Sequence, residues 1–299
     1  MSIFGTFRSW KQSDFLRNVV KVSSGRLSAM AIAVLATPVV SRLFAPEDYG
    51  VAAVVIAAIG IAASFLPLSY ERAVIFPKEE AKAGQVLVLA IVVSVVMTVA
   101  LYAVLGACSV IWPDIATNSG MGLYFWLFPA GAFLLALRHT ATAVCIRRKF
   151  FSSIAKADVT EAVVNSSTRI FWGIFLASSA AGLLFGYLLG VAFGALICGV
   201  RAYRWYSNIG VAGAKSELRS VLVEFRDYPL FRAPAKFAFT AAQRLPVIAL
   251  GFMFPLEIVG FYAMANRAAA MPLQAASQAV RDVLLQRIMG FRQNEVPMG

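Results

Sequence analysis

Long apolar runs recur along the chain, and short polar links separate them. Eight runs are long enough to cross a bilayer, because roughly 20 apolar residues span its hydrocarbon core. None shows the alternation of polar and apolar positions that membrane β-strands require. The pattern therefore predicts an all-α fold, a polytopic transmembrane helical bundle of about eight spans. The predicted spans are 27–44, 49–70, 84–111, 121–146, 154–177, 183–200, 231–254 and 259–285.

Composition and charge agree with a membrane protein. The chain is 60% hydrophobic and 14% charged, whereas soluble domains are about 25% charged. A net charge of +12 could suggest a nucleic-acid partner, but 21 of the 27 Lys and Arg residues fall in alternate links and the two ends, and none falls in the opposite links. This asymmetry predicts that both termini are cytoplasmic. We expect a lipid bilayer as partner and no nucleic acid.

The links divide the chain into three parts. Residues 1–26 mix aromatic and basic side chains and are predicted to lie as an amphipathic segment on the anionic cytoplasmic leaflet. Residues 27–205 form a first lobe of six helices, and residues 206–299 form a cytoplasmic link and two helices of a second, incomplete lobe.

A weak internal repeat supports this division. Pro38, Pro46 and Gly50 match Pro246, Pro255 and Gly260 when one inserted residue is allowed between successive matches. Six helices separate the copies, so both run in the same direction, as in transporters whose repeats are related by an axis along the membrane normal. Chance similarity between apolar helices is the alternative.

The remaining six Lys and Arg residues lie inside predicted spans, where each costs about 2.5–3.5 kcal/mol on insertion scales. Snorkelling at the interface is an alternative for Arg42 and Arg138, which lie nearer the ends of their helices. Polar side chains form a stripe on each of the last two spans, typical of a surface that faces a cavity, although a polar seam between helices is the alternative. The candidate substrate-binding residues are Arg138, Arg169, Lys236, Arg244, Asn266, Arg267 and Gln274.

This set is net positive, and arginine does not neutralise itself when buried. The predicted cavity therefore attracts an anion, and guanidinium forks with lysine point charges suit phosphate or pyrophosphate.

Few acids are available to neutralise these cations. Asp158 and Glu161 have two interpretations. They form a charged first turn at the start of their helix, which the helix dipole favours, or they pair with a basic residue, Lys156 or Arg138. Glu71 has two interpretations as well: a local ion pair with Arg72 at the membrane interface, or a part in closing a cytoplasmic gate.

Cysteine and histidine offer little chemistry. Cys108, Cys145 and Cys198 are scattered through apolar spans and are predicted to be small buried hydrophobic side chains. His139 is the single histidine, which disfavours a metal site and a Cys–His or Ser–His nucleophile. We expect no cofactor and no enzymatic activity.

Three stretches carry a family resemblance: 41–83, 225–237 and 258–283. They resemble bacterial polysaccharide exporters, the Wzx-type lipid-linked oligosaccharide flippases of the MATE-like (MOP) superfamily. The resemblance implies two six-helix lobes around a V-shaped cationic cavity in the bacterial inner membrane. It also implies alternating access that moves an undecaprenyl-pyrophosphate-linked oligosaccharide, as in lipopolysaccharide O-antigen synthesis. A polysaccharide polymerase and a chain-length regulator are the protein partners that it implies.

The chain departs from that family in having eight predicted helices instead of twelve or more. Three explanations account for this difference: a truncated product, a fragment, or a protein completed by another chain. We expect truncation, which puts export by this chain alone in doubt. The sequence leaves three other functions open. A MATE-type cation or drug antiporter needs deep acids, a polymerase or glycosyl transferase needs a larger extramembrane scaffold, and a remnant would only insert in the membrane.

Overall fold

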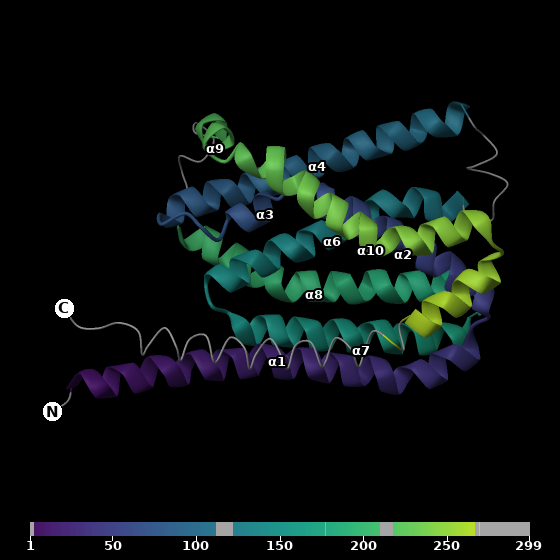
Figure 1. The fold of residues 1–299 in the computed structure, drawn as a ribbon, viewed down its shortest axis with the longest axis horizontal. Coiled ribbons are helices and arrows are strands. Elements are labelled where there is room, and N and C mark those ends of the chain that lie inside the picture. Colours follow the sequence, from purple (N-terminus) through teal and green to yellow (C-terminus); the bar gives the residue numbers. More distant parts are fainter. Residues whose placement is uncertain (1–2, 112–121, 177, 210–217, 267–268, 270–299) are drawn as a thin grey trace.

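The computed structural model describes residues 3–111, 122–176, 178–209, 218–266 and 269, and all of their regular structure is helical (Figure 1). The all-α prediction is confirmed over these residues. The elements are α1 (Ile3–Leu43), α2 (Pro46–Phe65), α3 (Tyr70–Ala73), α4 (Glu80–Ile111), α6 (Gly122–Arg147), α7 (Phe151–Phe175), α8 (Ala180–Asn208), α9 (Leu218–Glu224), the π-helical turn η1 (Tyr228–Arg232) and α10 (Ala233–Met253), followed by a helix over 256–266.

Five of the described helices contain a stretch long and apolar enough to cross a membrane: α1, α2, α4, α6 and α8. The predicted spans in α7 and α10 are long helices as well. Their hydropathy is lowered by internal polar and charged residues, such as Glu161 and Arg169 in α7 and Arg244 in α10. Most of the eighth predicted span lies outside the described residues. The chain is a polytopic helical membrane protein.

The helix α1 runs without a break from Ile3 to Leu43, so the predicted amphipathic segment continues directly into the first span. One predicted boundary differs from the structure. The predicted end of the second span at residue 70 was wrong, because α2 ends at Phe65. Pro67 cannot continue the helix, and Leu68 and Ser69 adopt the left-handed region with φ of 45° and 63°.

Packing in the first lobe is centred on α8. It lies along α7 and contacts α6, while α7 lies along α1 (Figure 1). Four glycines recur at every fourth residue of α8, and a Cβ at any of them would crowd α7: Gly182, Gly186, Gly190 and Gly194. Small residues at this spacing allow membrane helices to approach closely. Nearby, Cys145 and Cys198 are buried as predicted, and Cys108 is half-buried.

The predicted repeat is visible in a reciprocal contact between α2 and the helix over 256–266. A Cβ on Gly50 would overlap the carbonyl oxygen of Leu256, and a Cβ on Gly260 would overlap the carbonyl oxygen of Pro46. Each glycine therefore meets the residue four positions before the other glycine. Contacts of the form i to j and j to i are what a two-fold axis produces. This geometry supports parallel repeats over chance similarity.

The helix α10 packs along α2 and so joins the two repeats. A Cβ on Gly251 would lie 2.8 Å from Cγ2 of Val54, and the rings of Phe65 and Phe237 meet edge to face at 5.6 Å. Arg244 of α10 lies along this junction, beside Ile56 and Gly60 of α2.

Candidate functional site

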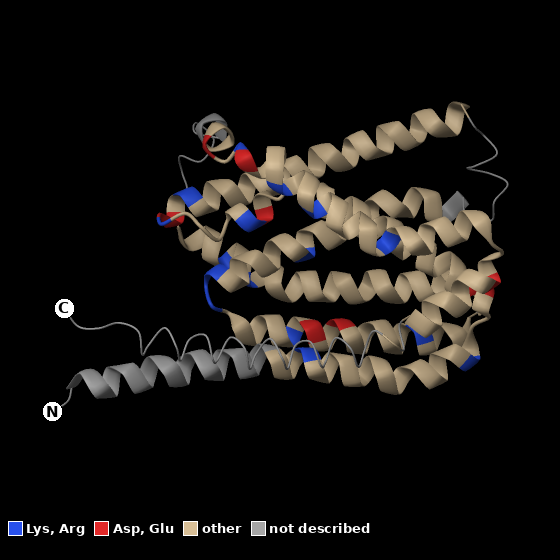
Figure 2. Cartoon of the chain, viewed as in Figure 1, with Lys and Arg blue, Asp and Glu red and all other residues tan. Residues whose placement is uncertain are grey.

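The described charges gather at one end of the bundle, where α3, α9 and the turn between α6 and α7 lie (Figure 2). A smaller set lies along the interior faces of the helices. It includes four of the predicted site residues, and each has a different environment.

Arg138 of α6 is buried, with 6% of its surface exposed, and is neutralised by two acids of α7. Its Nη2 lies 2.7 Å from Oδ1 of Asp158, and its Nε lies 3.3 Å from Oε2 of Glu161. Its Nη1 also donates to the hydroxyl of Thr142. Gly194 makes room for this group, because a Cβ there would lie 2.8 Å from Nε. Snorkelling of Arg138 was therefore the wrong alternative, and pairing of the acids with Arg138 is confirmed.

Lys236 of α10 pairs with Glu71 of α3, with 2.6 Å between Nζ and Oε1. Both side chains are well shielded, with 14% and 5% exposed. The other carboxylate oxygen of Glu71, Oε2, is buried without a hydrogen-bond partner among the described residues. The predicted local pair of Glu71 with Arg72 is wrong, since Glu71 turns to α10 while Arg72 is exposed. The observed pair links the two repeats.

Arg244 of α10 is half-buried at the α2 face. Its Nη1 donates to the carbonyl oxygen of Ile56 at 3.5 Å, and a Cβ on Gly60 would lie 2.5 Å from its Cζ. Among the described residues no carboxylate forms an ion pair with Arg244. Its guanidinium therefore keeps its charge next to the bundle interior.

Arg169 of α7 is buried, and its Nε donates to the carbonyl oxygen of Leu183 at 3.2 Å. Gly186 of α8 lies against its stem, because a Cβ there would lie 2.6 Å from Cγ. Arg138, Arg169 and Arg244 thus each pack across a glycine of a neighbouring helix.

Two further side chains lie near these cations, and the sequence did not single out either as a binding residue. The imidazole of His139 lies within electrostatic range of Arg72, Arg138, Lys236 and Arg244. The phenol of Tyr187 lies within range of Arg169, Glu161 and Arg244.

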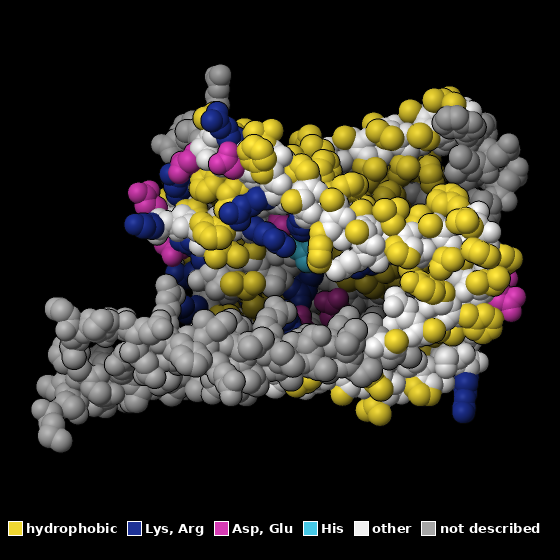
Figure 3. Space-filling model, in the orientation of Figure 1, with side chains coloured by type: hydrophobic (Ala, Val, Ile, Leu, Met, Phe, Trp, Pro, Cys, Tyr) yellow, Lys and Arg dark blue, Asp and Glu magenta, His cyan; other side chains and the backbone are white. Residues whose placement is uncertain are grey.

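Figure 3 shows a hollow in the molecular surface, with basic, acidic and histidine side chains at its floor and hydrophobic side chains around it. His139 is exposed, which agrees with its position in this hollow. Among the described residues the group contains five cations, Arg72, Arg138, Arg169, Lys236 and Arg244, and three carboxylates, Glu71, Asp158 and Glu161. We call this group the cationic cluster.

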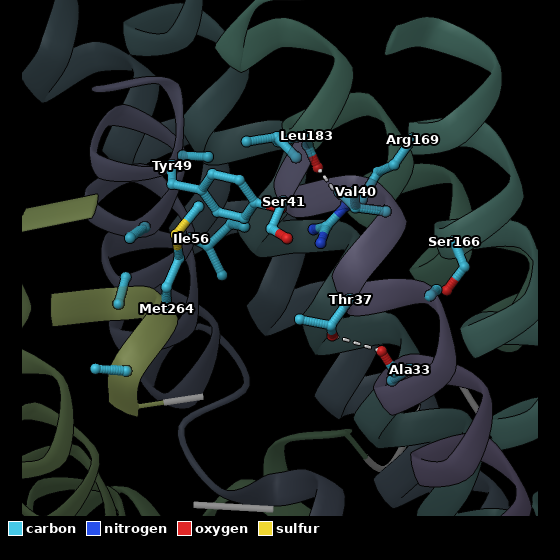
Figure 4. A pocket seen from close by; sticks show the side chains of 15 residues that line it. Ala33, Thr37, Val40, Ser41, Tyr49, Ile56, Ser166, Arg169, Leu183 and Met264 are labelled. Carbon is cyan, nitrogen blue, oxygen red and sulfur yellow. Dashed lines mark hydrogen bonds between the residues drawn. The ribbon is translucent and has the colours of Figure 1, made fainter. Parts of the chain in front are cut away.

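A cavity of about 470 Å³ extends from Arg169 towards α1 and α2 (Figure 4). Its walls come from α1, α2, α7, α8 and residues 263–265. The walls are largely small and apolar, and polar groups are contributed by Thr37, Ser41, Ser166 and Arg169. Ligand pockets commonly have volumes of about 300–1,000 Å³. The cavity is therefore large enough for a small polar ligand next to a guanidinium.

The structure brings Arg138, Arg169, Lys236 and Arg244 to one region. Asn266 is exposed on the helix over 256–266, next in sequence to the cavity wall. Arg267 and Gln274 lie outside the described residues. Arg232, the last residue of η1, lies over the rings of Phe76 and Tyr228 instead of in the cavity.

Sequence reasoning missed the long-range partner of Lys236, because no local pattern links Glu71 to α10. It also missed the packing role of the α8 glycines, although their spacing of four was a visible signal.

A family model described as polysaccharide biosynthesis protein matches residues 39–297. The matched stretch begins inside α1 and includes the whole cationic cluster. No curated protein and no solved structure matches the chain.

Proposed function

This chain belongs to the polysaccharide biosynthesis protein family, and on that premise we propose that it is a flippase for lipid-linked oligosaccharide units. The proposed substrate is an undecaprenyl-pyrophosphate-linked oligosaccharide. The proposed location is the bacterial inner membrane, with both termini cytoplasmic. The family itself supports the coarser statement, a membrane protein of polysaccharide biosynthesis.

The observation that carries the proposal is the charge of Arg244 in the cationic cluster. Arg138 and Lys236 are neutralised by acids, but no carboxylate among the described residues pairs with Arg244. Holding a guanidinium at membrane depth costs about 2.5–3.5 kcal/mol on insertion scales. A pyrophosphate in the hollow would offset this cost, because its oxygens accept the paired N–H groups of arginine.

The surroundings of Arg169 suit the sugar part of such a substrate. Hydroxyl groups of Thr37, Ser41 and Ser166 line the cavity beside the guanidinium, and its other walls are apolar (Figure 4). In this proposal the sugar units occupy the polar interior while the lipid tail remains in the bilayer.

Alternating access would require the contacts between the repeats to open in turn. At one end of the bundle the repeats meet through Gly50 and Gly260, and nearer the other end they meet through Glu71 and Lys236. We propose that a polysaccharide polymerase and a chain-length regulator act on the exported unit.

The antiporter alternative is less well supported. It needs carboxylates that are free to bind a cation, whereas Glu71, Asp158 and Glu161 are each paired with a basic side chain. We therefore propose transport of an anionic lipid, without a bond-making reaction.

Binding of the substrate headgroup tests the proposal. The protein is purified into lipid nanodiscs, and its affinity for a polyprenyl-pyrophosphate-linked oligosaccharide is measured for the parent and for Arg244→Gln. A charge-assisted hydrogen bond contributes about 1.5–3 kcal/mol, so we expect Arg244→Gln to weaken binding by roughly 10- to 150-fold. Inorganic pyrophosphate is expected to compete with the parent protein's ligand.

Arg42→Gln is the matched control, because Arg42 is an exposed guanidinium in the last turn of α1, outside the cationic cluster. It is expected to bind like the parent. Equal affinity of the parent and Arg244→Gln would contradict the proposed function.

A further inference from the structure

A second, apolar groove runs between α4, α6 and α8. Its volume is about 760 Å³, and its lining consists mainly of alanine and branched aliphatic side chains. Representative lining residues are Leu87 and Ile91 of α4, Leu134 and Leu137 of α6, and Leu196 and Gly199 of α8. The helices α4 and α8 both flank α6, and Figure 1 shows α4 slanting away from the rest of the bundle. The groove is therefore a separate feature from the cavity at Arg169.

The groove and the hollow at His139 lie on different faces of α6. Leu134, Leu137 and Ala141 follow the spacing of three and four that places residues on one helix face. His139 is two residues beyond Leu137, about 200° around the helix. The helix α6 thus separates the groove from the hollow in which His139 lies.

One end of the groove carries a cation between two aromatic side chains. Tyr203, Arg204 and Tyr206 line it there, in the part of α8 that extends beyond the predicted span at residue 200. Arg204 is exposed and forms no ion pair within the part of the chain that the structure describes. Tyrosines at the headgroup level and basic residues on the cytoplasmic side are typical of the membrane interface. This end therefore suits an anionic headgroup.

We propose that this groove is a binding site for a resident anionic phospholipid. One acyl chain lies along the apolar walls, and Arg204 binds the phosphate at the predicted cytoplasmic end. Basic pockets between membrane helices on that side bind anionic headgroups in this way. A phospholipid fits better than the tail of a carried substrate, since α6 separates the groove from the hollow at His139. The proposal does not depend on the proposed function.

Gly199 offers a way to fill the groove without disturbing the fold. A Cβ at Gly199 would meet no heavy atom within 4 Å, so its missing side chain is part of the open space. Gly199→Leu is expected to place an isobutyl group where the acyl chain lies. Gly106→Leu is the matched control, because Gly106 of α4 also has no atom within 4 Å of an added Cβ but does not line the groove.

The test is native mass spectrometry of the protein released from vesicles of equal parts phosphatidylglycerol and phosphatidylethanolamine. We expect the parent and Gly106→Leu to retain phosphatidylglycerol in preference to phosphatidylethanolamine. Gly199→Leu should retain at least tenfold less bound lipid. Arg204→Gln, an exposed change that leaves the core intact, should retain lipid but lose the preference for the anionic headgroup.

Three results would overturn the proposal. One is lipid retention by Gly199→Leu equal to that of Gly106→Leu. Another is equal retention of the two phospholipids by the parent. The third is displacement of bound phosphatidylglycerol by a polyprenyl-pyrophosphate-linked oligosaccharide, which would assign the groove to a carried lipid.

Discussion

The ion pair between Glu71 and Lys236 allows a quantitative prediction, because the chain contains an exposed pair of the same chemistry. Lys82 and Glu224 are also joined at 2.6 Å between Nζ and a carboxylate oxygen. Their side chains are 33% and 50% exposed, against 14% for Lys236 and 5% for Glu71. The two pairs share distance and chemistry and differ mainly in burial. We therefore consider the variants Glu71→Gln and Glu224→Gln side by side.

Burial sets the expected magnitudes. At 2.6 Å the attraction between unit charges is about 6 kcal/mol for an effective dielectric constant of about 20. Removing both charges from water costs a comparable amount, so the intact buried pair contributes little net stability. Removing one partner leaves the other buried and unpaired. Glu71→Gln is therefore expected to lower the free energy of unfolding by about 3–5 kcal/mol, and Glu224→Gln by about 0–1 kcal/mol.

The assay is a double-mutant cycle measured by reversible unfolding in mixed micelles. Because Glu71→Gln combined with Lys236→Met removes both buried charges, the double variant is expected to regain most of the stability lost in Glu71→Gln alone. The reasoning would be refuted by a cost of Glu71→Gln no larger than that of Glu224→Gln. Strict additivity of the two buried substitutions would refute it as well.

Two further predictions concern the repeats and the orientation. Gly50→Ala and Gly260→Ala should each destabilise the protein by several times more than Gly106→Ala in the same unfolding assay. The added methyl groups would overlap the backbone carbonyls of Leu256 and Pro46, whereas Gly106 has open space around it. Unfolding midpoints equal to the Gly106→Ala value would contradict the reciprocal contact. A green fluorescent protein fused after Gly299 should fluoresce in bacteria, because that end is predicted to be cytoplasmic. Alkaline phosphatase fused within 112–120 should be active, because Lys and Arg are absent from that link and it is predicted to lie on the opposite side. The opposite pattern of fluorescence and phosphatase activity would invert the predicted topology.

Local properties of the sequence determined the secondary structure of this protein. In lipid each span must satisfy its own backbone hydrogen bonds, so a long apolar run is helical whatever its neighbours are. The positions of Pro46 and Pro67 similarly mark the start of α2 and the turn after it. The sequence also indicated which cations lie at membrane depth, since hydropathy and helix rise suffice for that estimate.

The charge state of the site depended on tertiary structure. Glu71 lies 165 residues from Lys236 along the chain, and Asp158 lies 20 residues from Arg138. No helical periodicity relates residues on different elements, so only the packing of α10 on α2 and of α7 against α6 decided which carboxylate neutralises which cation. The same packing left Arg244 of α10 without a carboxylate among the described residues, and the packing of α4 and α8 around α6 opened the groove beside Gly199. Intrahelical geometry fixes which face of a helix a side chain occupies, but the partner on that face depends on how helices distant in sequence come together.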